Sequence, residues 1–476
     1  MIIIVTMLAY FAVLLIASRI TGRKATNDTF YRADRRSPWY MVAFGMVGAS
    51  ISGVTFISVP GMTLHSGMTY LQTCLGFIPG YFAVAFLLLP LYYRLNLTTI
   101  YTYLDRRLGA RAYQTGAWFF MLSKMTGAAV RFYVVCIVLH EFVLGPAGIP
   151  FAATAAGMVT LIWLYTRSGG VKTLVWTDTL QTLCMFAALV LIITEVAGAM
   201  GMGIGEAAAA VAADPRSRVF VFDDWVSTQN FWKQFVSGIF IVIVMTGLDQ
   251  DMMQKNLTCR TLREAQKDMC SYGFAFVPAN LLFLALGVLL AQYAASQGTA
   301  LPQSGDGLLP MFAATGHLGT TVLILFTIGI VAASFSSADS ALTALTTSYC
   351  VDIRRRPGDE RLRHRAHAGI CAMFVAFILL FRMANSTSVI DAIYILCSYT
   401  YGPLLGLFAF GLLTKRHTDG RAVPYIAVCS PAICLAADQT VYALTGYKFG
   451  YELLMINGAL TFAGLYAFSH RQTDAA

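Results

Sequence analysis

Thirteen apolar runs, separated by shorter polar stretches, follow one another along most of the chain. A helix needs about 20 apolar residues to cross the hydrocarbon layer of a membrane, and each run is close to that length or longer. The runs lie at residues 2–18, 39–64, 69–93, 113–142, 150–166, 173–199, 231–249, 271–295, 318–349, 367–384, 388–413, 422–444 and 451–469. No polar block between them is long enough to fold alone. The pattern predicts an all-α, polytopic membrane protein with a single transmembrane domain over residues 1–476.

Composition and charge agree with this interpretation. The chain is 57% apolar and only 12% charged, about half the charged fraction of roughly 25% in soluble proteins. If the N-terminus lies outside, the outer loops hold only four basic residues, which are Arg216, Arg218, Lys233 and Lys448. Basic residues concentrate on the cytoplasmic side of membrane proteins. We therefore predict a multi-pass protein of the inner (plasma) membrane with a cytoplasmic C-terminus, and no nucleic-acid partner despite the net charge of +9.

Four charged residues fall inside the predicted spans: Lys124, Arg131, Asp178 and Asp339. An ionised side chain at the bilayer centre costs at least about 2.5–3.5 kcal/mol, so each of them calls for a partner or a function.

A serine-rich turn surrounds Asp339. Positions three and four apart share a helix face, so Ser336, Asp339 and Ser340 converge and Ser337 lies one step round. Several oxygen ligands close together suit a hard cation. The alternative is that the hydroxyls bond to carbonyls four residues back or to a neighbouring helix. The second embedded carboxylate, Asp178, favours cation binding.

The span 39–64 contains small and hydroxyl residues near mid-depth, which are Gly45, Gly48, Ser50, Ser52, Gly53 and Thr55. Such residues tolerate local unwinding, and unwound carbonyls at the membrane midplane hold ions in secondary transporters. Glycines at a close helix crossing would give the same pattern.

Arg131 keeps its charge and must find a carboxylate, carbonyl groups or a polar cavity. One interpretation is a permanent ion pair with Asp178 or Glu141. The other is a cavity in which the guanidinium binds an anionic substrate in bidentate fashion. For Lys124 we expect a cytoplasmic gate charge or a side chain that reaches the membrane surface.

Two enzyme signatures are missing from the sequence. His140 and Glu141 lack the second histidine of an H-E-x-x-H zinc site, and there is no G-x-x-x-x-G-K-[ST] phosphate loop. We expect no enzymatic activity and no cofactor, and we expect an ion gradient to supply the energy.

Three segments resemble those of the sodium/solute symporter family: NDTFYRADRRSPWYM, GGVKTLVWTDTLQ and GLDQDMMQKNLTCRTLREAQK. Lys255 and Cys259 depart modestly from the family pattern. The resemblance implies a LeuT-like core of two five-helix inverted repeats, with additional helices on either side. The repeats would cover residues 39–199 and 231–413, preceded by one helix at 2–18 and followed by two helices at 422–469.

The resemblance also implies ion sites. A first sodium position would use the carbonyls of Gly48, Ile51 and Ala333 and the hydroxyls of Ser336 and Ser337. A second sodium position, found in relatives that resemble the bacterial sialic acid carriers, would use Asp178, Ser336, Asp339 and Ser340. Asp339 replaces a serine there, which leaves sodium and proton binding both open.

For the substrate, the resemblance points to a carboxylated solute. The sugar-carrying branch has polar ligands at positions that align with Val54, Thr55, Val242 and Met245, and they are missing here. Arg131 precedes Asp178 by 47 residues, which is the spacing of the substrate-binding arginine in the sialic acid branch. The implied substrate ligands are Ser50, Ser52, Thr55, Gln72 and Arg131.

The sequence therefore predicts a sodium-coupled importer of sialic acid or a simpler monocarboxylate, working by alternating access as a monomer in the lipid bilayer. A sodium/sugar symporter is the alternative, followed by a proton-coupled carrier, a passive channel and a membrane sensor.

Overall fold

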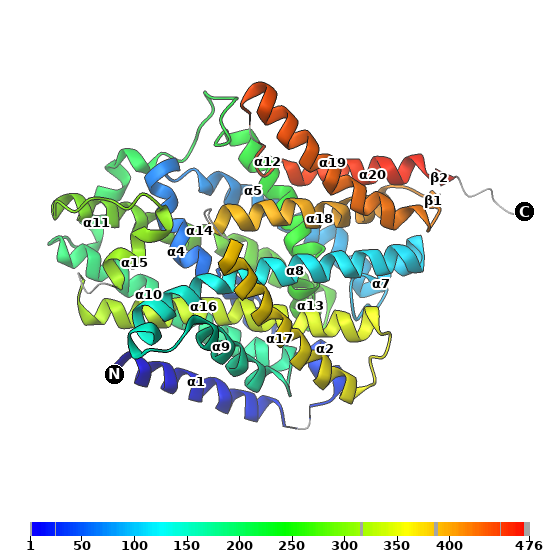
Figure 1. The fold of residues 1–476 in the computed structure, drawn as a ribbon, viewed down its shortest axis with the longest axis horizontal. Helices are drawn as coiled ribbons and strands as arrows, with labels where there is room; N and C mark the ends of the chain where they lie inside the picture. Colours follow the sequence, from blue (N-terminus) through cyan, green and yellow to red (C-terminus); the bar gives the residue numbers. More distant parts are fainter. Residues whose placement is uncertain (1, 24, 315–317, 385–388, 448, 471–476) are drawn as a thin grey trace, which may run out of the picture.

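The computed structural model describes the chain except for residues 1, 24, 315–317, 385–388, 448 and 471–476. Long helices run side by side along the molecule, with α1 along one edge and α19 and α20 at the opposite edge (Figure 1). Two very short strands, β1 (His417–Thr418) and β2 (Ser469–His470), pair antiparallel with His417 opposite His470.

The described residues of the first half of the chain form eleven α-helices. They are α1 (Ile2–Thr21), α2 (Asn27–Arg32), α3 (Trp39–Ser50), α4 (Gly53–Ser66), α5 (Tyr70–Ala83), α6 (Leu89–Arg94), α7 (Thr102–Leu108), α8 (Ala110–Leu139), α9 (Phe151–Thr166), α10 (Val171–Ala199) and α11 (Ile204–Ala213). The second half holds α12 (Phe231–Val242), α13 (Gln250–Asn256), α14 (Leu262–Ser296), α15 (Leu308–Ala313), α16 (Gly319–Ser348), α17 (Glu360–Ala384), α18 (Val389–Leu413), α19 (Ala422–Thr445) and α20 (Leu453–Ala467).

Short turns of tighter or wider helix join some of these elements. The π-helical turns are Val84–Leu88, His140–Leu144, Ile243–Gly247 and Tyr349–Ile353, and the 3₁₀ turns are Ala33–Arg35, Gly145–Ala147, Pro215–Ser217 and Gly305–Gly307.

All thirteen predicted runs coincide with helical segments, except that residue 388 lies outside the described residues. Within the described chain, eight helices are long and apolar enough to cross a membrane, and two sharply bent pairs raise the number to ten. The runs that contain α1, α9 and α20 are shorter apolar helices. The structure therefore confirms the all-α membrane architecture, while the thirteen crossings and the limits of the two repeats stay predictions.

The first bent pair is α3 and α4, which meet at 60° around Ile51 and Ser52. Ser52 has extended backbone angles (φ −76°, ψ 172°), so the last carbonyl groups of α3 lose their helical partners. This break falls within the segment whose glycine and hydroxyl content predicts unwinding. A second interpretation of the same glycines holds as well, because Gly48 lies directly against Thr182 of α10.

The second bent pair was not predicted. The run 231–249 was expected to be one uninterrupted crossing followed by an inner loop, but the chain bends by 69° and continues as α13. Asp249 stands at the bend with extended angles (φ −104°, ψ 120°), and its carboxylate accepts a hydrogen bond from the backbone N–H of Asp251 at 2.8 Å. An aspartate that caps a helix start in this way favours a new helix after the turn.

Helix α16 lies at the centre of the bundle and packs against α10, α8, α4 and α3. Nearly all of its side chains from Val322 to Ser348 are buried. Large apolar side chains such as Leu87, Leu183 and Leu444 are exposed on other helices, as expected of a surface that faces lipid. The predicted polar turn around Asp339 is therefore enclosed by neighbouring helices.

The contact between α3 and α10 gives a direct test of this packing. A Cβ atom added at Gly48 would come within 1.8 Å of Thr182 Oγ1 and 3.2 Å of its backbone Cα. Because the backbone must then shift, we expect Gly48→Ala to destabilise the protein by about 1–3 kcal/mol, visible as a lower thermal unfolding midpoint. Gly157→Ala on α9 is the matched control, since nothing lies within 4 Å of its added Cβ. Equal midpoints for the two variants would contradict the close contact.

Candidate functional site

A polar cavity lies where the two broken helices meet α5, α8, α14, α16 and α18. Its walls combine hydroxyl groups, two basic side chains, two carboxylates and several aromatic rings. The polar lining residues include Ser50, Ser52, Thr55, Tyr81, Ser123, Lys124, Arg131, Thr246, Asp249, Asp251, Tyr272, Ser337 and Tyr401. The cavity thus joins residues from both halves of the chain.

Arg131 projects from α8 and lines this cavity, half-buried. Neither carboxylate suggested by the sequence lies in ion-pair contact with it, because Asp178 binds Lys255 and Glu141 is exposed. Among the described residues, no carboxylate lies within ion-pair distance of its guanidinium. The structure therefore favours the cavity interpretation of Arg131 over the permanent ion pair.

Lys124 differs from the expectation of a gate charge or a side chain that reaches the membrane surface. It lies on α8, on the N-terminal side of Arg131. The residue is 7% exposed, and its ammonium pairs with Asp249 at 3.1 Å and with Asp251 at 2.7 Å. Tyr401 also donates a hydrogen bond to Asp249. The carboxylate partners follow the unpredicted second break, so the sequence pattern offered no counter-charge for Lys124.

The hydroxyl groups predicted to bind substrate line the cavity. Ser50 shares a hydrogen bond with the hydroxyl of Tyr272, and Ser52 and Thr55 belong to the same wall at the start of α4. Tyr272, from α14, was not predicted.

Gln72 is not brought to this cavity. Its side chain is fully buried, its Nε2 donates to the carbonyl of Gln229 at 2.9 Å, and its Oε1 accepts from the backbone N–H of Val221 at 3.1 Å. Both ends of the amide are therefore occupied by the stretch that leads into α12. Its position in the third predicted run, residues 69–93, gave no sign of this loop.

The residues of the predicted first sodium position come together at the break between α3 and α4. The hydroxyl of Ser337 donates to the carbonyl of Ala49 at 2.7 Å and contacts the carbonyl of Ala333 at 3.2 Å. Gly48 and Ile51 belong to the same end of α3. Unpaired carbonyls and serine hydroxyls in one place are the ligands that suit a hard monovalent cation.

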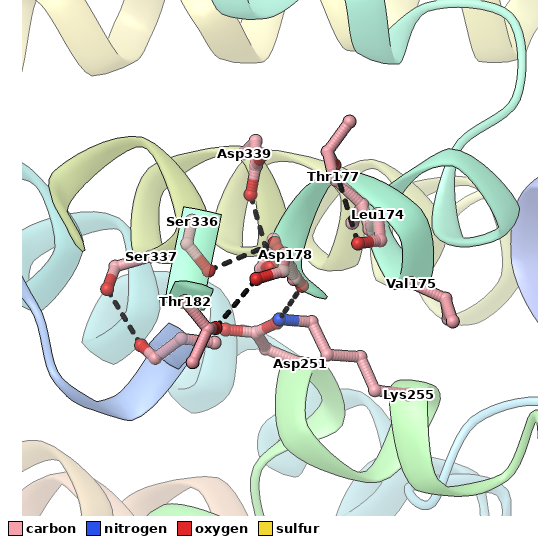
Figure 2. A network of polar contacts seen from close by, with 12 residues as sticks. Leu174, Val175, Thr177, Asp178, Thr182, Asp251, Lys255, Ser336, Ser337 and Asp339 are labelled. Atoms are coloured by element: carbon pink, nitrogen blue, oxygen red, sulfur yellow. Dashed lines mark hydrogen bonds and ion pairs between the residues drawn. The ribbon is translucent and has the colours of Figure 1, made fainter. Parts of the chain in front are cut away.

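The residues of the predicted second position also lie together, on α10 and α16 (Figure 2). Ser336 donates to Asp178 Oδ1 at 3.0 Å. Asp339 accepts hydrogen bonds from Tyr165 at 2.7 Å and from Ser340 at 3.2 Å. The structure adds Lys255, which in the sequence is only a departure from the family pattern: its ammonium lies 2.7 Å from Asp178 Oδ2.

No group of three or more His, Cys, Asp or Glu side chains that could hold a metal ion occurs in the described part of the chain. The arrangement instead combines a membrane-embedded polar cavity, two broken helices beside it and oxygen ligands for a monovalent cation. These features define a secondary transporter of small solutes.

Comparison with known proteins agrees with this class. The model of the sodium:solute symporter family matches residues 30–424. The sodium/sialic acid symporter SiaT of Proteus mirabilis is 26% identical over 89% of this chain and 87% of its own length. The sodium/sialic acid symporter NanT of Aliivibrio fischeri is 26% identical over 94% and 90%. The chain belongs to the sodium:solute symporter family.

A solved structure of a Na⁺-coupled sialic acid symporter in a substrate-bound, outward-open state shares the fold. Its TM-score is 0.81 at 21% identity, with 98% of this chain and 97% of that chain covered. These findings confirm the LeuT-like fold, the family resemblance and the role as a sodium-coupled symporter of a small solute.

Proposed function

We propose that this protein imports a small carboxylated solute across the plasma membrane, with its N-terminus outside and its C-terminus in the cytoplasm. One observation carries the choice of substrate class. Arg131 lines the cavity without a carboxylate partner among the described residues, whereas Lys124, the other basic side chain of the cavity, is bound by two aspartates. A carboxylated solute supplies the anion that Arg131 lacks.

A solute carboxylate would bind the guanidinium through two parallel hydrogen bonds, which gives both affinity and a fixed orientation. The hydroxyls of Ser50, Ser52 and Thr55 face the same cavity and would bind polar groups on the rest of the solute. Sialic acid combines a carboxylate with several hydroxyl groups, and two of the relatives are named for it. A simpler monocarboxylate is the second candidate because it satisfies Arg131 alone.

Sodium would bind first at the junction of Ser337 and the end of α3, where the ion holds the broken helix against α16. The proposed hydroxyl ligands Ser50, Ser52 and Thr55 lie on either side of this break along the chain. A sodium ion that binds the substrate-competent conformation more tightly raises the affinity of the protein for substrate. Bound substrate then raises the affinity for sodium by the same factor. This reciprocity supplies the coupling without a chemical step.

A neutral sugar is less well supported. It would leave the charge of Arg131 without an anion, and apolar Val54, Val242 and Met245 line the same cavity. Burying a charge without its partner is costly.

Matched solutes test the substrate class. We expect purified protein in liposomes, under an inward sodium gradient, to take up labelled sialic acid or lactate. The methyl ester of sialic acid keeps the hydroxyl groups but loses the charge, so it should compete at least about 30-fold more weakly, as about 2 kcal/mol of lost charge pairing requires. Glucose serves as the neutral control. Equal competition by acid and ester, or uptake of glucose alone, would exclude the carboxylate assignment.

A further inference from the structure

Lys255 occupies an unusual position for a basic residue in a membrane protein. Its side chain is only 3% exposed, and its ammonium lies 2.7 Å from Asp178 Oδ2 (Figure 2). It reaches this place because the bend at Asp249 turns α13 toward α10 and α16, and α13 is in contact with both. A buried lysine with a single carboxylate partner in the middle of a predicted ion site calls for a role.

The protein itself supplies partners for every carboxylate oxygen of the second predicted position. Asp178 Oδ1 accepts from Ser336 and Oδ2 binds Lys255. Asp339 Oδ1 accepts from Ser340 and Oδ2 accepts from Tyr165. Each of these oxygens therefore already has one donor or cation in contact with it, and a sodium ion would have to share them.

Charge opposes a second sodium as well. The ammonium carries the same single positive charge as sodium and already pairs with Asp178, which leaves Asp339 as the other carboxylate of the position. Two like charges a few ångströms apart repel strongly inside a protein, where the effective dielectric constant is well below that of water. The first position has no such competitor in the described structure, because Ser337 contacts only the neutral carbonyls of Ala49 and Ala333.

We infer that the ammonium of Lys255 is a tethered cation that takes the place of a second sodium ion beside Asp178, so that the protein binds one sodium per transport cycle. This inference rests on the proposed sodium site at the α3–α4 break and adds to it the number of ions. Sodium entry and exit would then involve only the first position, while Lys255 stays paired with Asp178 throughout.

Direct counting of bound sodium tests the inference. Equilibrium binding of ²²Na⁺ to purified protein, with choline as the replacement cation, should give one ion per chain and a Hill coefficient of 1. Lys255→Met empties the position beside Asp178, so its count should rise to two. Lys172→Met is the matched control, because it removes a lysine paired with Asp34 at 3.4 Å in a partly exposed place, and its count should stay at one.

The outcomes separate the two levels of the proposal. Two ions per wild-type chain would overturn the tethered cation while leaving sodium coupling intact, as would a folded Lys255→Met protein that still binds one. No sodium binding by the wild type would overturn the sodium site itself. If Lys255→Met does not fold, the wild-type count decides alone.

Discussion

Replacing Arg131 with glutamine should abolish uptake of carboxylated solutes while leaving a folded protein. Truncating one member of a buried charge pair costs about 2–5 kcal/mol of binding energy, which weakens affinity at least about 30-fold. Folding should be spared because no described carboxylate loses an ion-pair partner when Arg131 is removed. Solute affinity is measured by competition in liposomes, and folding by the thermal unfolding midpoint of the purified protein.

Two variants sharpen this comparison. Arg131→Lys keeps the charge but loses the bidentate fork, so its affinity should fall between wild type and Arg131→Gln. Lys124→Gln leaves Asp249 and Asp251 without their shared cation and should lower the unfolding midpoint, unlike Arg131→Gln. Unchanged solute affinity in Arg131→Gln, or unfolding of that variant, would return Arg131 to a structural role.

Replacing Asp178 with asparagine should have the largest effect on stability. The change leaves the buried ammonium of Lys255 without its counter-charge, and breaking a buried ion pair in this way costs about 3–5 kcal/mol. The double variant Asp178→Asn with Lys255→Met removes both charges together and should regain most of the loss, because replacing a whole buried pair is often nearly neutral. The unfolding midpoints of the wild type, the two single variants and the double variant together form a double-mutant cycle.

An exposed pair provides the reference for this cycle. Asp34→Asn breaks the contact with Lys172, whose side chain is 41% exposed, and should cost no more than about 1 kcal/mol. If Asp178→Asn loses as little stability as Asp34→Asn, Asp178 and Lys255 do not stabilise each other. The same conclusion would follow if the double variant were no more stable than Asp178→Asn.

Most of the architecture follows from hydropathy, because backbone groups in lipid must be satisfied within each helix. The first break is also visible in the sequence, since glycines and hydroxyl residues cluster there. The second break lacks such a cluster: Gly247 and Asp249 stand in a segment that is otherwise apolar or resembles a loop. A single capping aspartate is a weak signal against a strong apolar run.

In the candidate site, too, some residues can be recognised from the sequence and others cannot. The serine-rich turn, Asp178 and Arg131 are recognisable because charges and hydroxyls stand out inside apolar runs. The charged partners of Lys124 and Asp178 are not recognisable, because they lie at the second break or on α13, whose path depends on that break. Gln72 shows the reverse case: the family resemblance implied a substrate ligand, but its side chain holds the segment before α12, which no periodicity connects to it.

Sodium-driven accumulation is the most direct test of the central claim, which is that oxygen ligands at the α3–α4 break couple a sodium gradient to movement of an anion held by Arg131. Liposomes containing the purified protein are given an inward sodium gradient or an equal choline gradient, and labelled sialic acid or lactate is followed inside. The account predicts accumulation above the external concentration with sodium only, lost when a sodium ionophore collapses the gradient. Uptake that is the same with choline and never exceeds the external concentration would contradict it.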